Sequence, residues 1–229
     1  MIIIKQKVLF EVNMKRFYIY LIALVAIFCL SSCKMSFGSE YSKEGVDEFC
    51  DTFGEPEGDG LLKGIVYSRD KCYNVTPKKV SEETDFRIFK FSHACDSFLV
   101  FENELYPMPT FGGWGFHNAV PCDFDNDGNK DLLIALSWGS GMHRSIITVF
   151  NSVTRKYTDI YDTSKDTSLT NFLPVDLIVS DDFTVYFVDV IINDRTNGEN
   201  NLADLTFEVT GVAGYVSVED GEIVFKKGE

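Results

Sequence analysis

The side chains with the clearest chemical potential in this chain are acids that alternate along one short segment. Asp123, Asp125, Asp127 and Asp131 lie within nine residues, and Gly128 stands between the third and the fourth. Carboxylates at relative positions 1, 3, 5 and 9, with glycine at position 6, let a tight loop wrap oxygen ligands around one hard cation. The spacing therefore predicts a cation-binding loop.

Each residue of this loop has an expected role. Asp123, Asp125 and Asp127 would offer side-chain oxygens. Asn129 would offer its backbone carbonyl oxygen, and Asp131 a carboxylate oxygen directly or through water. Ca²⁺ accepts such ligands at about 2.3–2.6 Å in an adaptable geometry, whereas Mg²⁺ requires a near-ideal octahedron, so we expect Ca²⁺. The alternative is an acidic hairpin turn that holds no metal.

The residues after the loop exclude a helix-loop-helix EF-hand. That motif needs a bidentate Glu at position 12, but the residue there is Ile134, inside the apolar run from Leu132 to Leu136. With Phe111-Gly112 upstream, the acidic loop resembles the FG-GAP/VCBS repeat of integrin α-chain propellers and many bacterial surface proteins. The resemblance covers residues 111–150 and implies a calcium site between the β-strands of a propeller blade. Because one clear copy is present where propellers show several, a propeller-like arrangement and an open sandwich both remain.

Aromatic, histidine and glycine residues flank this segment on both sides. Trp114 and His117 precede it, and Trp138, His143 and Arg144 follow it. We expect them in two loops near the cation, as a candidate surface for a small ligand or a partner; the alternative is that the glycines make turns and the tryptophans cap the core. No histidine of the chain stands in an HExxH, GxSxG or comparable setting, so we expect no enzyme, the alternative being a hydrolase that uses His117 or His143 as a base.

The elements that position these residues are predicted to be strands. From residue 61 onward, short apolar runs are separated by Gly, Asn, Asp and Pro, and Asp220-Gly221 between two runs is typical of a type I′ hairpin turn. We expect one short helix within residues 42–53 and then a single all-β domain over residues 61–229, with antiparallel strands in about three hairpin-based sheets. The predicted strands are 64–68, 85–91, 97–102, 131–137, 145–151, 156–161, 175–180, 184–191, 205–210, 215–218 and 222–226.

The N-terminal segment indicates export. Residues 17–30 form a run of 14 apolar residues after Lys15 and Arg16, and a membrane-spanning helix needs about 20, so a signal peptide is expected. The stretch from Leu30 to Cys33 resembles the lipobox of bacterial lipoproteins. The resemblance implies that residues 1–32 are removed and that Cys33 carries a lipid, with residues 33–60 as a tether. An ordinary secretory signal and an uncleaved anchor remain as alternatives, as do starts at Met1 and at Met14.

The charge restricts the partners of the chain. It has 21 Lys and Arg residues against 35 Asp and Glu residues, a formal net charge of −14. Loss of residues 1–32 would leave 17 basic against 34 acidic residues, a net charge of −17. Such a charge argues against a nucleic-acid partner and favours cations or basic proteins.

Four cysteines remain for the folded part. They are Cys50, Cys72, Cys95 and Cys122, and neighbouring members are more than 20 residues apart, whereas zinc sites use closely spaced pairs. An exported domain can hold disulfides, so we expect one or two disulfides rather than a zinc site. The sequence leaves all three pairings open.

Together these features predict a lipid-anchored, non-enzymatic, calcium-binding β domain that acts as a binding module in the cell envelope. By resemblance to Gram-negative lipoproteins, Lys34 after the lipid site favours the outer membrane if the host is Gram-negative, with the domain facing the periplasm or the exterior. The alternative is an acidic inhibitor or immunity-type lipoprotein that binds a basic enzyme, because its charge would steer that association.

Overall fold

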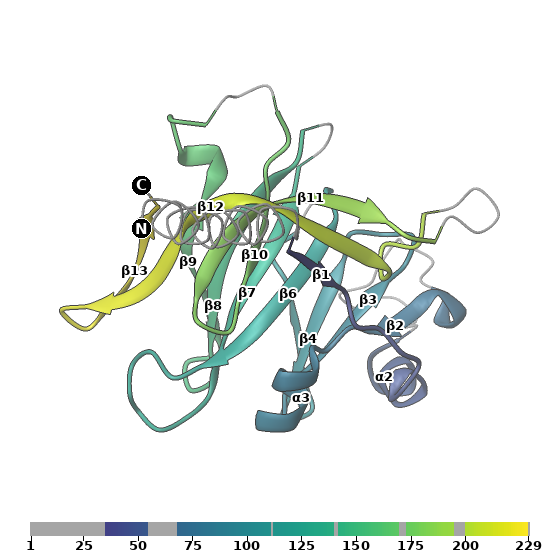
Figure 1. Cartoon of the computed structure of the whole chain (residues 1–229). Coiled ribbons are helices and arrows are strands. Elements are labelled where there is room, and N and C mark those ends of the chain that lie inside the picture. Colours follow the sequence, from purple (N-terminus) through teal and green to yellow (C-terminus); the bar gives the residue numbers. More distant parts are fainter. Residues whose placement is uncertain are drawn as a thin grey trace, which may run out of the picture. The chain divides into compact units, whose positions relative to one another are not determined.

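Three antiparallel sheets, built mainly from strands that follow one another along the chain, form most of the structure (Figure 1). The structure is a computed structural model that describes residues 35–54, 68–110, 112–139, 142–169, 173–194 and 200–228. All of its helices and strands belong to the unit Ser36–Glu229. The expected signal peptide, the lipobox with Cys33 and the predicted strand at 64–68, apart from residue 68, lie outside the described residues.

Each sheet contains a meander of four consecutive strands. The first sheet has the order β2 (Cys72–Asn74), β3 (Arg87–Phe91), β4 (Ser97–Phe101) and β5 (Glu104–Pro107). The middle sheet has the order β6 (Gly115–Cys122), β7 (Asp131–Trp138), β8 (Arg144–Asn151) and β9 (Lys156–Asp162). The third sheet runs through β10 (Asp176–Val179), β11 (Thr184–Ile192), β12 (Leu205–Glu219) and β13 (Glu222–Lys227), and β1 (Ser36–Gly38) pairs with the other end of β12.

The sheets stack as layers, and the middle sheet is covered on both faces. Leu132, Ile134 and Leu136 of β7 pack into the core shared with the first sheet, whereas Leu133 and Ala135 pack into the core shared with the third sheet. Polar side chains on either face of β7 would be buried in one of these cores, which explains why residues 132–136 of this strand are all apolar. The expected all-β class with three antiparallel sheets is confirmed, and its layers are sandwich-like.

Two α-helices are found in the described residues. The helix α2 (Val46–Phe53) lies within the segment where a helix is predicted, and its Phe49 ring stacks on Phe89 of the first sheet at 4.2 Å between centroids. The helix α3 (Lys78–Glu83) was not predicted and buries Val80 in the core between the first and middle sheets. Two 3₁₀ turns, η1 (Arg69–Lys71) and η2 (Thr163–Lys165), complete the elements. No helix in the part of the chain that the structure describes is long and apolar enough to cross a membrane.

The strands differ from the prediction in three ways. The predicted strands at 205–210 and 215–218 are one strand, β12, and the hairpin at Asp220-Gly221 is confirmed, with φ of 50° and 83°. Strands β1, β2, β5 and β6 were not predicted. Residues 36–54, assigned above to a tether, pair with β12 or pack on the first sheet.

Candidate functional site

The acidic loop is the connection between β6 and β7. It leaves β6 at Asp123 and enters β7 at Asp131, so the expected loop-to-strand arrangement is confirmed. Asn126 and Gly128 have φ of 56° and 86°, and these left-handed residues turn the chain back on itself. Alternate side chains of the loop therefore point toward one centre.

Three of the predicted ligands converge. Asp123, Asp125 and Asp127 each place one carboxylate oxygen within 4.8 Å of the other two. Backbone N–H groups hold two of these side chains, because Asp127 N donates to Asp125 Oδ1 at 3.2 Å and Asn129 N donates to Asp127 Oδ1 at 2.7 Å. Asp123 Oδ1 is buried and has no hydrogen-bond partner among the described residues.

Asp131 lies outside this group of three carboxylates. Its side chain is buried, and Oδ1 accepts hydrogen bonds from Ser152 N at 2.8 Å and from Ser152 Oγ at 3.1 Å. Burial raises the pKa of this carboxyl above its usual range, the Ser152 hydrogen bonds oppose that rise, and the charge of Asp125 adds to it. Asn151 links the two parts of the loop, because its Nδ2 donates to Asp125 Oδ2 at 3.0 Å and to Asp131 Oδ2 at 3.2 Å. Asp131 thus anchors the loop to β8.

The donor set of the loop suits a hard divalent cation. Three carboxylates supply oxygen ligands, which Ca²⁺ prefers over nitrogen or sulfur. A buried carboxylate oxygen without a partner is costly, and a cation would satisfy it. Carbonyl oxygens and water would have to complete the six to eight ligands that Ca²⁺ takes.

The expected position of the aromatic and histidine residues near the cation is wrong. They lie at the other end of the β6–β7 hairpin, around Asp176 of β10, which the sequence did not single out. His117 is fully buried, and its Nδ1–H donates to the carbonyl oxygen of Leu177 at 2.8 Å. Its Nε2 faces Asp176 Oδ1 at 3.7 Å, too long for a hydrogen bond, and neither atom has a partner among the described residues. With the proton on Nδ1, a neutral His117 presents a lone pair to the carboxylate, so two acceptors face each other.

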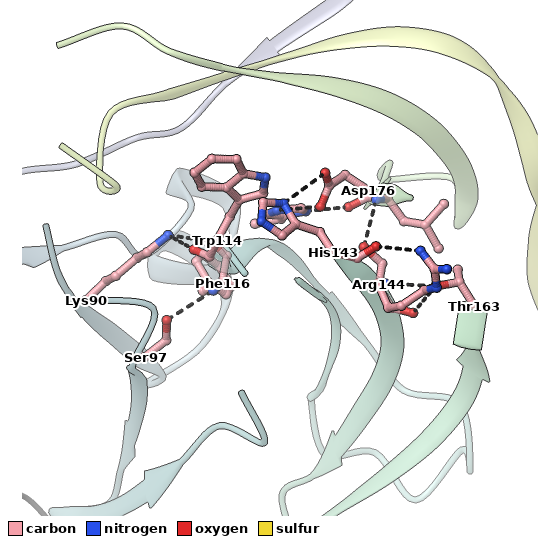
Figure 2. Close-up of polar contacts among 11 residues, drawn as sticks. Lys90, Ser97, Trp114, Phe116, His143, Arg144, Thr163 and Asp176 are labelled. Atoms are coloured by element: carbon pink, nitrogen blue, oxygen red, sulfur yellow. Dashed lines mark hydrogen bonds and ion pairs between the residues drawn. The ribbon is translucent and has the colours of Figure 1, made fainter. Parts of the chain in front are cut away.

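His143 and Trp114 close this cluster on its outer side (Figure 2). His143 Nδ1 lies 4.0 Å from Asp176 Oδ2, and the His143 side chain is 22% exposed. The Trp114 ring meets His143 edge to face, with 4.5 Å between ring centroids. The two other residues of the predicted surface behave differently: Arg144 donates to the carbonyl oxygens of His143 at 3.0 Å and Leu173 at 2.7 Å, and Trp138 Nε1 is buried without a partner among the described residues.

Lys90 of β3 lies next to these residues, and no sequence pattern identified it as part of a site. Its Nζ donates to the carbonyl oxygens of Trp114 at 2.5 Å and of Phe116 at 3.0 Å (Figure 2). Burial lowers the pKa of Lys90 to about 7, and burial also lowers the pKa of His117 despite the opposing effects of Asp176 and Leu177. We name Lys90, His117, His143 and Asp176 the buried polar cluster. A short motif could not have found it, because its members come from three strands and from the loop before β8.

A groove of about 880 Å³ lies apart from both sites. It is lined by polar and charged residues of the first sheet and its surroundings, including Glu40, Lys78, Arg87 and Glu102. None of the residues of the predicted ligand surface lines it. Comparison of the chain with protein-family models, with curated proteins and with solved structures gives no match.

Proposed function

We propose that this protein is a lipid-anchored, calcium-binding β domain of the cell envelope that acts as a binding module. The observation that carries the proposal is the convergence of the Asp123, Asp125 and Asp127 carboxylates, one of which has a buried oxygen without a partner among the described residues. Ca²⁺ bound there would neutralise the repulsion between these carboxylates and order the connection between β6 and β7.

The cation has a structural rather than a chemical role in this proposal. The loop joins the edge strand β6 of the middle sheet to the central strand β7, so fixing it would stabilise the hairpin on which both neighbouring sheets pack. Asp125 and Asp127 are exposed, so a bound cation would present a charged surface to a partner. The lipid anchor rests on the lipobox at residues 30–33, and the binding role on the net negative charge of the chain.

The decisive experiment is thermal unfolding of the protein, purified from membranes in detergent, with Ca²⁺, with Mg²⁺ and with chelator. We expect Ca²⁺ to stabilise the protein by about 1–3 kcal/mol at modest excess over its dissociation constant. The Asp125→Asn/Asp127→Asn variant should lose this response, because both changes keep the side-chain shape and remove the charge. Asp220→Asn is the matched control, since Asp220 is an exposed acid in the turn between β12 and β13.

Two outcomes would contradict the calcium role. An equal response of wild type and double variant would place the cation elsewhere, and no response in either would leave the loop as an acidic turn. The second result would favour the acidic inhibitor as the function. The anchor is tested separately, because Cys33→Ser should abolish incorporation of a labelled fatty acid and release the protein from membranes.

A further inference from the structure

The helix α2 and the first strand of the first sheet each carry a cysteine. Cys50 lies in the last turn of α2, and Cys72 is the first residue of β2. Both side chains lie in the hydrophobic cluster between α2 and the first sheet, and each thiol affects the pKa of the other. All four cysteines of the described residues are free thiols, and among them Cys50 and Cys72 are the two that share a hydrophobic cluster.

The surroundings hold both thiols in place. Phe49, the residue before Cys50, is buried against Phe89 and Phe98 of the first sheet, with 4.2 and 6.3 Å between ring centroids. On the other side, Lys43 Nζ donates to the carbonyl oxygen of Cys72 at 2.7 Å. Arg69 of η1 pairs with Asp47 and Asp51 of α2, which ties the helix to the turn that leads into β2.

We infer that Cys50 and Cys72 are a redox pair that oxidises to a disulfide joining α2 to the first sheet. The oxidant is a disulfide, either of a small molecule or of a thiol oxidoreductase. The half-buried Cys50 attacks it as the thiolate and forms a mixed disulfide, since Cys72 is fully buried. Cys72 then attacks the Cys50 sulfur, so that two thiols become one disulfide while the oxidant is reduced to two thiols and takes up both protons.

The acidity of the two thiols indicates when this reaction happens. Burial raises the pKa of both, that of Cys72 to about 12, so the folded pair holds little thiolate near neutral pH. The order of attack by Cys50 and then Cys72 therefore applies to slow oxidation of the folded protein, and faster oxidation is expected during folding, before α2 has packed, when either thiol can attack first. The other two cysteines have different surroundings: Cys95 Sγ accepts a hydrogen bond from Gly112 N at 3.1 Å, and Cys122 is buried in the core between the middle and third sheets. They should stay thiols.

The inference goes beyond the calcium proposal. It uses one part of that proposal, the location in the cell envelope, because that compartment would supply the oxidant.

A tryptic digest of the chain separates the cysteines well, because Cys50 lies in peptide 44–63, Cys72 in peptide 72–78, and Cys95 with Cys122 in peptide 91–130. After the unfolded chain is refolded with oxidised glutathione, free thiols are alkylated and the peptides are weighed. We expect peptide 44–63 linked to peptide 72–78, and peptide 91–130 alkylated twice.

A stability measurement accompanies the digest. Reduction should lower the denaturant midpoint of the wild type and of Cys95→Ala, and it should leave Cys50→Ala unchanged, because a cross-link over 22 residues restricts the unfolded chain. The inference is overturned if peptides 44–63 and 72–78 are both alkylated, or if either is linked to peptide 91–130. A link after refolding that is missing from protein taken from membranes would contradict the envelope location and leave the pair standing. A missing calcium response would bear on neither result.

Discussion

The acidic loop and the buried polar cluster lie at opposite ends of the same hairpin, and they are built in opposite ways. The loop takes its three converging carboxylates from five consecutive residues, and two of the three are exposed. The cluster takes Lys90, His117 and Asp176 from strands of three different sheets, and His143 from the loop before β8. Charge repulsion among neighbours dominates the first region, and loss of hydration dominates the second.

This difference determines what each end can respond to. At the loop, solvent screens the carboxylates, and a multivalent cation is the agent that can hold them together. In the cluster, burial suppresses the charged forms of Lys90 and His117, so the agent there is the proton. The hairpin therefore has a cation-sensitive end and a proton-sensitive end, and four experiments can separate them.

The largest expected effect is the pH dependence caused by Lys90. Its pKa is about 7 in the folded protein and ordinarily 10.5, so between these values the unfolded chain binds a proton that the folded chain does not. The free energy of unfolding should therefore rise with pH over this range, by up to about 1.4 kcal/mol per pH unit and on the order of several kcal/mol in all. Lys90→Met should remove this rise. Urea unfolding of the wild type and the variant from pH 7 to 10 would measure the difference.

The control for this experiment is Lys165→Met, because Lys165 is exposed and its side chain is solvated. Subtracting the curve of each variant from that of the wild type cancels the other groups that titrate in the range. Parallel curves for wild type and Lys90→Met would show that Lys90 stays charged, and the proton-sensitive end would then be limited to His117. Calcium affinity should not change in either variant.

The second effect is smaller and lies on the acid side. The pKa of His117 is lowered in the folded protein, so below its ordinary value of 6.5 the unfolded chain binds more protons than the folded one. Stability due to His117 is present above that pH and is lost as the pH falls, by up to about 1.4 kcal/mol per pH unit. His117→Gln, which keeps a donor for Leu177, should lose less stability between pH 6.5 and 5 than the wild type. Exposed His93→Gln should behave like the wild type, and the opposite order would contradict burial as the cause.

The two ends also differ in how far the sequence predicts them. The acidic loop is predicted because its residues are neighbours in the chain, and the apolar run after it predicts β7 because both faces of that strand are buried. Asp176 and Lys90 carry no local pattern that distinguishes them from surface charges. What places them at His117 is the stacking of three sheets, which depends on contacts across the whole chain.

Strand β6 is an element that the sequence did not predict, because its local pattern is irregular. Its first residue, Gly115, has φ of 70°, and an added Cβ would meet the carbonyl oxygen of Cys95 at 1.9 Å, so glycine is required there. A register shift between Phe116 and Asn118 and the proline at position 121 remove the regular alternation of a strand. The segment was therefore interpreted as an aromatic loop, whereas its partner β7 holds it as a strand.

The third effect returns to the loop. Asn151 Nδ2 donates to both Asp125 and Asp131, so Asn151→Ala should remove the link between Asp125 and β8 and cost about 1–2 kcal/mol. We also expect the calcium titration midpoint to move to higher concentration, because the carboxylates are no longer held in position. Asn193→Ala is the matched control, since Asn193 Nδ2 donates to Asp204 and Thr206 far from the loop. An unchanged midpoint in Asn151→Ala would mean that the loop orders itself without β8.

The smallest effect compares two glycines with nearly the same backbone. Gly128 and Gly221 have φ of 86° and 83°, and an added Cβ would meet nothing within 4 Å at either position. Alanine should therefore cost about 1 kcal/mol at each, from the left-handed backbone alone. Only Gly128 turns the chain between the carboxylates, so only Gly128→Ala should also weaken the stabilisation by Ca²⁺. Equal calcium responses in the two variants would show that the left-handed turn at Gly128 is not what brings the carboxylates together, and the cation-sensitive end would then depend on the Asp side chains and Asn151 alone.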